Sequence, residues 1–211
     1  MIKTQIVEGL EVYSCLPTKK TKKLPVLFVH GAFAGGWMWT ETFMPFLAAA
    51  GYPCYALSLR GHGGSHGRDH LDWHSITDYI DDVKTVVDWL GETPVLVGHS
   101  MGGLHSWCVA AERPDLVRGL VVEDMAPDFV GRTAGPWEPW LHSLPEEFPS
   151  EESVLREFGP LAGRYFLEAF DRTPTGWRLH GRPERWVDIA AEWGTRDYWR
   201  QWEAVRAPTL L

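Results

Sequence analysis

The sequence has few cysteines and no long hydrophobic run, and each of these absences excludes a class of protein. Its three cysteines, an odd number, cannot all pair within one chain: Cys15, Cys54 and Cys108. Each lies in an apolar segment, so we expect free buried thiols and a reducing, cytoplasmic location. Residues 1–5 have no apolar signal core, and no stretch approaches the length that spans a bilayer, so we expect no membrane association.

Positive charge is also scarce. The chain carries 20 Lys and Arg against 28 Asp and Glu, a formal net charge of −8. Because phosphate groups bind to a basic face, this balance argues against nucleic acid or an anionic membrane as a partner. The one basic run, residues 19–23, lies between two strand-like segments, where a solvated hairpin turn is its expected role.

With 211 residues, the chain is long enough for one sizeable core and too short for two comfortable domains. Within the first 123 residues, apolar runs of strand length alternate with helical stretches. Strands are expected at residues 2–8, 10–16, 25–30, 53–59, 93–97 and 116–123, and helices at residues 37–50, 76–90 and 102–112. This alternation predicts an α/β fold, a mostly parallel sheet with helices on both faces.

The pattern changes after Ala126. From there to about Arg206 we find no buried strand, but a segment rich in Trp, Pro, Gly and charged residues. Helix-like stretches occur in it at residues 151–158, 161–170 and 183–193. We therefore expect an inserted helical cap over the edge of the sheet. Residues 1–126 would form the core, residues 127–206 the cap, and residues 207–211 the start of a further core strand.

The segment Gly98-His99-Ser100-Met101-Gly102 joins an expected buried strand to an expected helix. A serine hydroxyl is a weak nucleophile at neutral pH, and a strained strand-to-helix corner lifts it toward an incoming carbonyl. Glycines at both flanks avoid side-chain clashes at such a corner. The corner also aims the first N–H groups of the helix at the reacting carbonyl. We therefore predict Ser100 as a nucleophile and the Met101 N–H as an oxyanion donor.

A second glycine-rich segment, residues 30–36, directly follows the buried strand at residues 25–30. An oxyanion needs two donors from different loops, and the Ala32 N–H is the candidate for the second. His30 itself ends an apolar strand, so we expect it to hydrogen-bond backbone and to take no part in the chemistry.

Three motifs together resemble those of the α/β-hydrolase superfamily: His30-Gly31 with Trp37, the run Arg60-Gly61-His62-Gly63-Gly64-Ser65, and residues 98–103. With the strand order, they cover residues 1–126. Within the superfamily, the chain is most similar to small bacterial esterases, lactonases and C–C bond hydrolases with a cap. The resemblance implies Ser100 as the nucleophile and the N–H groups of Ala32 and Met101 as the oxyanion hole.

A serine triad also needs a histidine base and a carboxylate that orients it. In the superfamily these usually follow the last two strands, with the acid after a segment like residues 207–211, where this sequence ends. We therefore expect a C-terminally truncated hydrolase. Some members place the acid after the strand that follows the nucleophile helix, which is the place of Asp124. Its alternative role, which we prefer, is a strand-end carboxylate that caps a backbone loop.

We find no convincing base among the other histidines. His99 is next to the nucleophile in the sequence, and this position turns its side chain away from Ser100. A group of four histidines recurs every four residues, a spacing that would align metal ligands on a helix: His62, His66, His70 and His74. Glycines among the first of them argue against a helix there. We therefore expect neither a metal site nor a cofactor.

These features predict a serine hydrolase that cleaves a carboxylic ester, lactone or thioester of an apolar small molecule through an acyl-enzyme. Many of the 12 tryptophans lie after residue 136, which indicates an aromatic-lined pocket. We expect the substrate to contact Phe33, His99, Trp137 and Trp140. Two alternatives stay open: C–C bond hydrolysis with the same residues, and a non-catalytic binding protein on the same scaffold.

Overall fold

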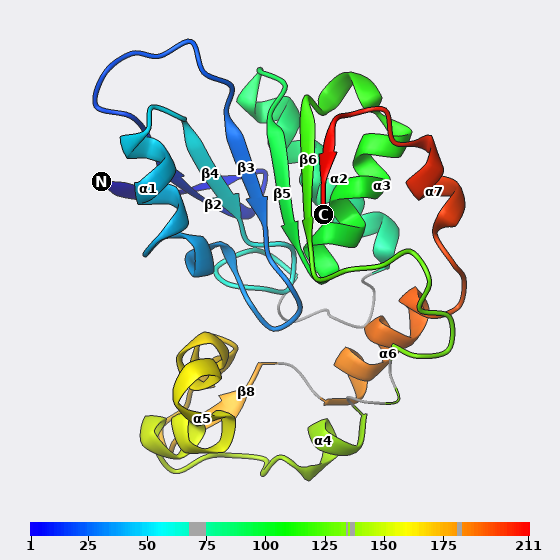
Figure 1. The fold of residues 1–211 in the computed structure, drawn as a ribbon. Helices are drawn as coiled ribbons and strands as arrows, with labels where there is room; N and C mark the ends of the chain where they lie inside the picture. Colours follow the sequence, from blue (N-terminus) through cyan, green and yellow to red (C-terminus); the bar gives the residue numbers. More distant parts are fainter. Residues whose placement is uncertain (68–74, 134, 136–137, 181–182) are drawn as a thin grey trace.

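The computed structural model describes residues 1–67, 75–133, 135, 138–180 and 183–211. These residues form a seven-stranded sheet from β1 (Ile2–Val7), β2 (Leu10–Cys15), β3 (Val26–Val29), β4 (Cys54–Leu57), β5 (Val95–His99), β6 (Gly119–Glu123) and β9 (Thr209–Leu210). The strand order is β1-β2-β4-β3-β5-β6-β9 (Figure 1). β1 and β2 are antiparallel to their neighbours, and the other five strands are parallel. The mostly parallel sheet predicted from the sequence is confirmed.

Helices cover both faces of this sheet. They are η1 (Gly36–Trp39), α1 (Phe43–Ala49), α2 (Ile76–Leu90), α3 (Met101–Glu112), η3 (Pro114–Leu116) and α7 (Trp199–Ala204). Val26 and Phe28 of β3 belong to one hydrophobic cluster with η1 and α1, whereas Leu27 and Val29 belong to a second with α2 and α3. Because side chains alternate along a strand, α1 lies on the opposite face from α2 and α3 (Figure 1).

The helix expected over residues 37–50 is in fact two shorter ones, η1 and α1, and Pro45 explains the break. Proline has no N–H to donate into a preceding turn, and its ring clashes with the carbonyl four residues back. It is therefore tolerated in the first turn of a helix, which is where α1, beginning at Phe43, places it. The Thr40 N–H and hydroxyl both donate to the Trp37 carbonyl and close η1.

α3 runs through the interior, and all of its residues from Met101 to Ala110 are buried. α2 and α7 pack along it, and the rings of Trp107 in α3 and Trp202 in α7 meet edge to face, with centroids 5.3 Å apart. The cysteines at positions 15, 54 and 108 are buried and unpaired, as expected from their apolar surroundings. Within the described segments, no helix has both the length and the apolar character needed to cross a membrane.

Between β6 and α7 the chain forms a separate layer, which we call the cap, at the carboxyl ends of the parallel strands (Figure 1). It consists of α4 (Glu138–Ser143), α5 (Glu151–Leu167), β7 (Phe170–Arg172), β8 (Trp177–Leu179) and α6 (Pro183–Trp193). Gly159, with φ 79°, interrupts α5 between the two helical stretches predicted from the sequence. The hairpin of β7 and β8 was not predicted, because strands of three residues are too short to show alternation. α6 has the predicted bounds.

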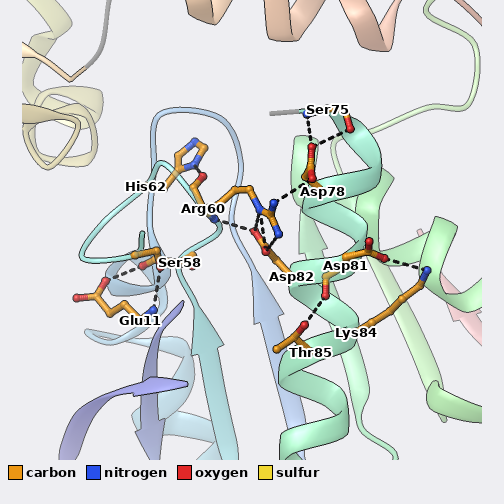
Figure 2. A network of polar contacts seen from close by, with 11 residues as sticks. Glu11, Ser58, Arg60, His62, Ser75, Asp78, Asp81, Asp82, Lys84 and Thr85 are labelled. Carbon is orange, nitrogen blue, oxygen red and sulfur yellow. Dashed lines mark hydrogen bonds and ion pairs between the residues drawn. The ribbon is translucent and has the colours of Figure 1, made fainter. Parts of the chain in front are cut away.

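A charged network joins α2 to the loop that follows β4 (Figure 2). The buried Asp82 carboxylate accepts hydrogen bonds from the Arg60 backbone N–H at 2.8 Å and from its Nε and Nη2 at 2.9 and 2.6 Å. Arg60 Nη1 also donates to Asp78 at 3.0 Å. Asp78 in turn accepts from the N–H and hydroxyl of Ser75 at the start of α2. The network fixes the loop that carries His62 against α2.

We expect Asp82→Ala to lower the free energy of unfolding by about 3 kcal/mol, because it leaves the half-buried Arg60 guanidinium without its main acceptor. Asp81→Ala is the matched control. Asp81 is the neighbouring carboxylate on the exposed side of α2, and its ion pair with Lys84 (3.4 Å) is worth less than about 1 kcal/mol. Urea unfolding followed by circular dichroism measures both variants. Equal losses in the two would contradict the role given to Asp82.

Candidate active site

The chain passes from β5 to α3 through a single residue, Ser100. Its backbone has φ 50° and ψ −121°, a conformation that is strained for a residue with a side chain. Two hydrogen bonds hold this corner. The Ser100 N–H donates to the Glu123 carbonyl at 2.8 Å, and the Ser100 carbonyl accepts from the Gly103 N–H at 2.8 Å. The structure therefore has the strand-to-helix corner predicted from the motif, with Ser100 at its apex.

Two glycines allow α3 to approach the sheet closely at this corner. A side-chain carbon on Gly98 would collide with the Gly102 carbonyl oxygen and lie 2.7 Å from the Gly103 Cα. A side-chain carbon on Gly102 would collide with the carbonyl oxygen of Val29 in β3. Because these obstacles are backbone atoms, a larger residue at either position would push α3 away from the sheet.

The loop after β3 lies against the corner. A side-chain carbon on Gly31 would be 2.9 Å from the His99 ring and 3.3 Å from the Ser100 Cβ. The fully buried His30 anchors this loop through backbone groups, as predicted. Its Nε2 accepts the Leu59 N–H at 2.9 Å, which leaves Nδ1 to donate to the Gly31 carbonyl at 2.7 Å. Burial lowers the pKa of His30 to about 4, so the ring is neutral at physiological pH.

A cavity of about 440 Å³ lies at the corner. Five residues predicted from the sequence line it together: Ala32, Phe33, Ser100, Met101 and Asp124. Met101 is the first residue of α3, so no carbonyl of a preceding helical turn accepts a hydrogen bond from its N–H. Asp124 follows β6 directly, and the pairing of His99 with Glu123 in the sheet brings it beside Ser100. The nucleophile candidate, both oxyanion candidates and the carboxylate candidate thus share one cavity.

Backbone strain is concentrated around this cavity. Four non-glycine residues in the described part of the chain have positive φ, and three of them line the cavity: Phe33 (61°), Ser100 (50°) and Asp124 (54°). Such conformations cost on the order of 1–3 kcal/mol each and persist where the surrounding structure imposes them. Their clustering supports a functional role for the cavity.

One wall of the cavity comes from the cap. Four residues of α6 line the cavity at the spacing i, i+3, i+4 and i+7, which places them on one helix face: Trp186, Ile189, Ala190 and Trp193. Trp186 and Trp193 belong to the tryptophan-rich segment from which an aromatic-lined pocket was predicted, but none of the four was among the predicted substrate contacts. Their spacing marks the apolar face of a helix, but it does not tell which surface that face covers. The remaining lining residues come from α4 and the segment after β6: Met125, Ala126, Phe129, Arg132, Thr133 and Leu141.

Three of the predicted substrate contacts are not among the described lining residues. His99 faces the other side of the corner, where its Nδ1 lies 3.5 Å from the Glu123 carboxylate. This follows from its place directly before Ser100, since neighbouring side chains in a strand point in opposite directions. Trp140 packs behind Phe33, with ring centroids 6.4 Å apart, and supports the cavity wall from outside. Trp137 lies outside the described residues.

The cap is tied to the core at the inner end of α6. The Glu192 carboxylate accepts a hydrogen bond from the Ile76 N–H, the first of α2, at 2.9 Å. The Glu192 carboxylate therefore lies at the N-terminus of α2, where the helix dipole stabilises a negative charge. Two residues further, the Gly194 carbonyl accepts the Gly131 N–H at 3.0 Å. These contacts hold the α6 face over Ser100.

Comparison with known proteins assigns this architecture to a family. A family model described as the alpha/beta hydrolase fold matches residues 25–173, which is more than half of the chain. The chain belongs to the α/β-hydrolase family.

Several relatives and solved structures resemble this α/β-hydrolase. Epoxide hydrolase 4 of Mus musculus is 30% identical over 115 residues, which are 54% of this chain and 31% of that protein. Salicylic acid-binding protein 2 of Nicotiana tabacum is 30% identical over 148 residues, 64% of this chain and 56% of that protein. The matches thus span about a third and just over half of these two proteins.

The crystal structure of E-2-(acetamidomethylene)succinate hydrolase superposes with a TM-score of 0.79 at 24% identity. The superposition covers 99% of this chain and 79% of that one, and it shows a shared fold.

The histidines described in this α/β-hydrolase lie outside the cavity lining. His105 sits inside α3, where its ring stacks on Tyr79 at 5.1 Å and meets the edge of Trp193 at 6.2 Å. Neither of its ring nitrogens has a hydrogen-bond partner among the described residues. His70 and His74 lie outside the described residues. Within those residues, no group of three or more His, Cys, Asp or Glu is arranged to hold a metal ion.

We expect this α/β-hydrolase to lose stability as the pH falls below about 6.5. Burial lowers the pKa of His105 to about 3, whereas an unfolded histidine titrates near pH 6.5. Between these values the unfolded chain binds a proton that the folded chain excludes. The free energy of unfolding therefore decreases as the pH falls, by up to about 1.4 kcal/mol per pH unit for each such histidine.

His105→Phe keeps a ring against Tyr79 and removes the titrating group. Urea unfolding between pH 6.5 and 4.5 should show a pH slope smaller by about one proton than in the parent chain. The free energies of unfolding of the parent and the variant are also compared at pH 7.5, so that a loss of stability from altered packing is measured separately from the pH dependence. An unchanged slope would show that His105 does not contribute to acid unfolding.

Proposed function

We propose that this α/β-hydrolase cleaves a carboxylic ester of an apolar small molecule, with Ser100 as the nucleophile. One observation carries the proposal: Ser100 at its strained corner lines a single cavity with Ala32 and Met101. Ala32 lies in the loop after β3 and Met101 in the first turn of α3, so their N–H groups can approach one reacting oxygen from two sides. This is the arrangement that acyl transfer requires.

In the proposed reaction, the Ser100 oxygen attacks the ester carbonyl carbon. The charge that develops on the carbonyl oxygen is stabilised by hydrogen bonds from the N–H groups of Ala32 and Met101. Collapse of the tetrahedral intermediate releases the alcohol and leaves an acyl group on Ser100. Water then attacks the carbonyl carbon of this acyl-enzyme, the bond to the serine oxygen breaks, and the carboxylic acid is released with the free serine.

A base must take the Ser100 proton and return it to the leaving alcohol. The described cavity lining contains no histidine. We therefore assign the base to a group outside that lining. Asp124, beside Ser100 at the end of β6, is the carboxylate available to orient such a base or to cap the local backbone.

The substrate class follows from the cavity walls. Apart from Ser100 and Asp124, the described lining has two residues with polar side chains, Arg132 and Thr133, and the rest are apolar or aromatic. Such walls favour an apolar acyl or alcohol group. The relatives are named for different reactions and ligands, so the choice of an ester rests on the serine nucleophile.

The first test supplies a base from solution. Without an added base, we expect the 211-residue chain to react with nitrophenyl esters only at the residual rate given by binding and the oxyanion hole, about 10³–10⁴ over water. Added imidazole should accelerate acylation of Ser100, because it can accept the hydroxyl proton. Intact-mass and peptide mass spectrometry identify the acylated residue, and a fluorophosphonate probe provides a second label.

Ser100→Ala is the control, since imidazole also hydrolyses nitrophenyl esters by itself. The adduct and the imidazole-dependent labelling should both disappear in this variant. Labelling of Ser100→Ala equal to that of the parent chain would refute the nucleophile.

The second test concerns Asp124. We expect Asp124→Asn to lower imidazole-dependent acylation of Ser100 by less than about tenfold, because a freely diffusing base needs no carboxylate to orient it. Asparagine tolerates the positive φ of this position, so the fold should be retained, which circular dichroism verifies. A fall of a thousandfold or more with the fold intact would show that Asp124 acts on Ser100 directly.

A further inference from the structure

The cavity contains a local positive charge in a chain that is acidic overall. Among the described lining residues, Arg132 is the only one with a cationic side chain. The net charge of the whole chain is −8, so its overall field repels anions. A cation in the lining of a mostly apolar cavity is therefore a local feature that can distinguish one class of ligand from another.

Arg132 is held by a defined turn. Its backbone N–H donates to the Phe129 carbonyl at 3.0 Å, and the Gly131 N–H donates to the Gly194 carbonyl at the end of α6. A side-chain carbon on Gly194 would collide with the Thr133 hydroxyl, so the turn lies directly against this end of the helix. The turn thus fixes the backbone of Arg132 at the cavity, next to Trp193.

Part of the guanidinium remains available to a ligand. The contacts found for it within the described residues both involve Nη2, with the Asp128 carbonyl and, at 3.5 Å, with the Asp128 carboxylate. Both side chains are exposed, Arg132 by 65% and Asp128 by 58%, and such surface pairs are worth about 0–1 kcal/mol. Nε and Nη1 can therefore donate to a second acceptor, and a carboxylate matches the fork geometry of an arginine.

The cavity lining contains one charged side chain of each sign, Asp124 and Arg132. Asp124 lies beside Ser100, because the sheet pairing aligns the ends of β5 and β6. An anionic group on the ligand is repelled there and attracted at Arg132, whose turn is joined to the end of α6. Apolar side chains, including Trp186 and Ile189, line the same cavity.

We propose that the substrate is an ester that carries a carboxylate at the end distant from the scissile carbonyl, and that Arg132 binds this carboxylate. This inference rests on the proposed function for the position of the scissile bond. It adds a substrate class, apolar esters with an anionic tail, and makes Arg132 a specificity-determining residue.

The test compares the binding of two matched ligands to the Ser100→Ala chain, in which turnover is blocked. Monomethyl adipate and methyl hexanoate share an ester and a four-methylene chain and differ only in a terminal carboxylate or methyl group. Tryptophan fluorescence reports binding, because Trp186 and Trp193 line the cavity. We expect monomethyl adipate to bind about tenfold more tightly, a preference that decreases with added salt.

Four substitutions in this background assign the effect. Arg132→Gln should abolish the preference, and Arg132→Lys should retain part of it, because lysine keeps the charge without the fork. Asp128→Asn should strengthen adipate binding about twofold, since it removes the competing carboxylate. Arg164→Gln, which removes an equal charge from an exposed site on α5, should leave the preference unchanged.

Equal binding of the two ligands, binding of neither up to their solubility, or a preference that survives Arg132→Gln would overturn the proposal. Acylation of Ser100 is measured separately with neutral nitrophenyl esters. A failed binding test with intact acylation rejects the anionic tail alone, and failed acylation rejects the nucleophile.

Discussion

The close contact between the first turn of α3 and the sheet is the constraint on which the site depends. There is no space for a side-chain carbon at Gly98 or Gly102, because the obstacles are the carbonyl oxygens of neighbouring backbone. This contact forces the chain to turn from strand to helix at Ser100 alone, at the cost of a positive φ. The same turn directs the first N–H groups of α3 into the cavity that Ser100 lines. The proposed nucleophile and the proposed oxyanion site thus depend on one backbone geometry.

The surroundings supply the energy that maintains this strained corner. α3 is buried along most of its length between the sheet, α2 and α7, so it cannot shift to relieve the strain. The buried pair of Arg60 and Asp82 fixes the neighbouring loop to α2. The start of α2 also binds Glu192 of α6, so one helix supports the core loop and the cap wall together. A strained site of this kind requires such a rigid frame.

The sequence predicted the core more fully than the cap. Strand alternation and the glycine spacing around Ser100 are local signals, and the structure has the parallel sheet and the corner they indicate. The position of Pro45 could also have predicted the break between η1 and α1. The richness of the cap in tryptophan predicted an aromatic-lined pocket, to which Trp186 and Trp193 belong. It did not predict that these two residues and Arg132 line it at Ser100, because that depends on how α6 and its adjoining turn dock on the core. Docking is a tertiary property, and in the cap it leaves no glycine motif comparable to that around Ser100.

A crystal structure of the chain with a phosphonate bound to Ser100 tests the central claim most directly, because the adduct resembles the tetrahedral intermediate. We expect a covalent bond from the Ser100 oxygen to phosphorus. One phosphoryl oxygen should lie within about 3.1 Å of the backbone nitrogens of both Ala32 and Met101. A phosphoryl oxygen that points to solvent, or an adduct on another residue, would contradict the assignment of this corner as the catalytic site.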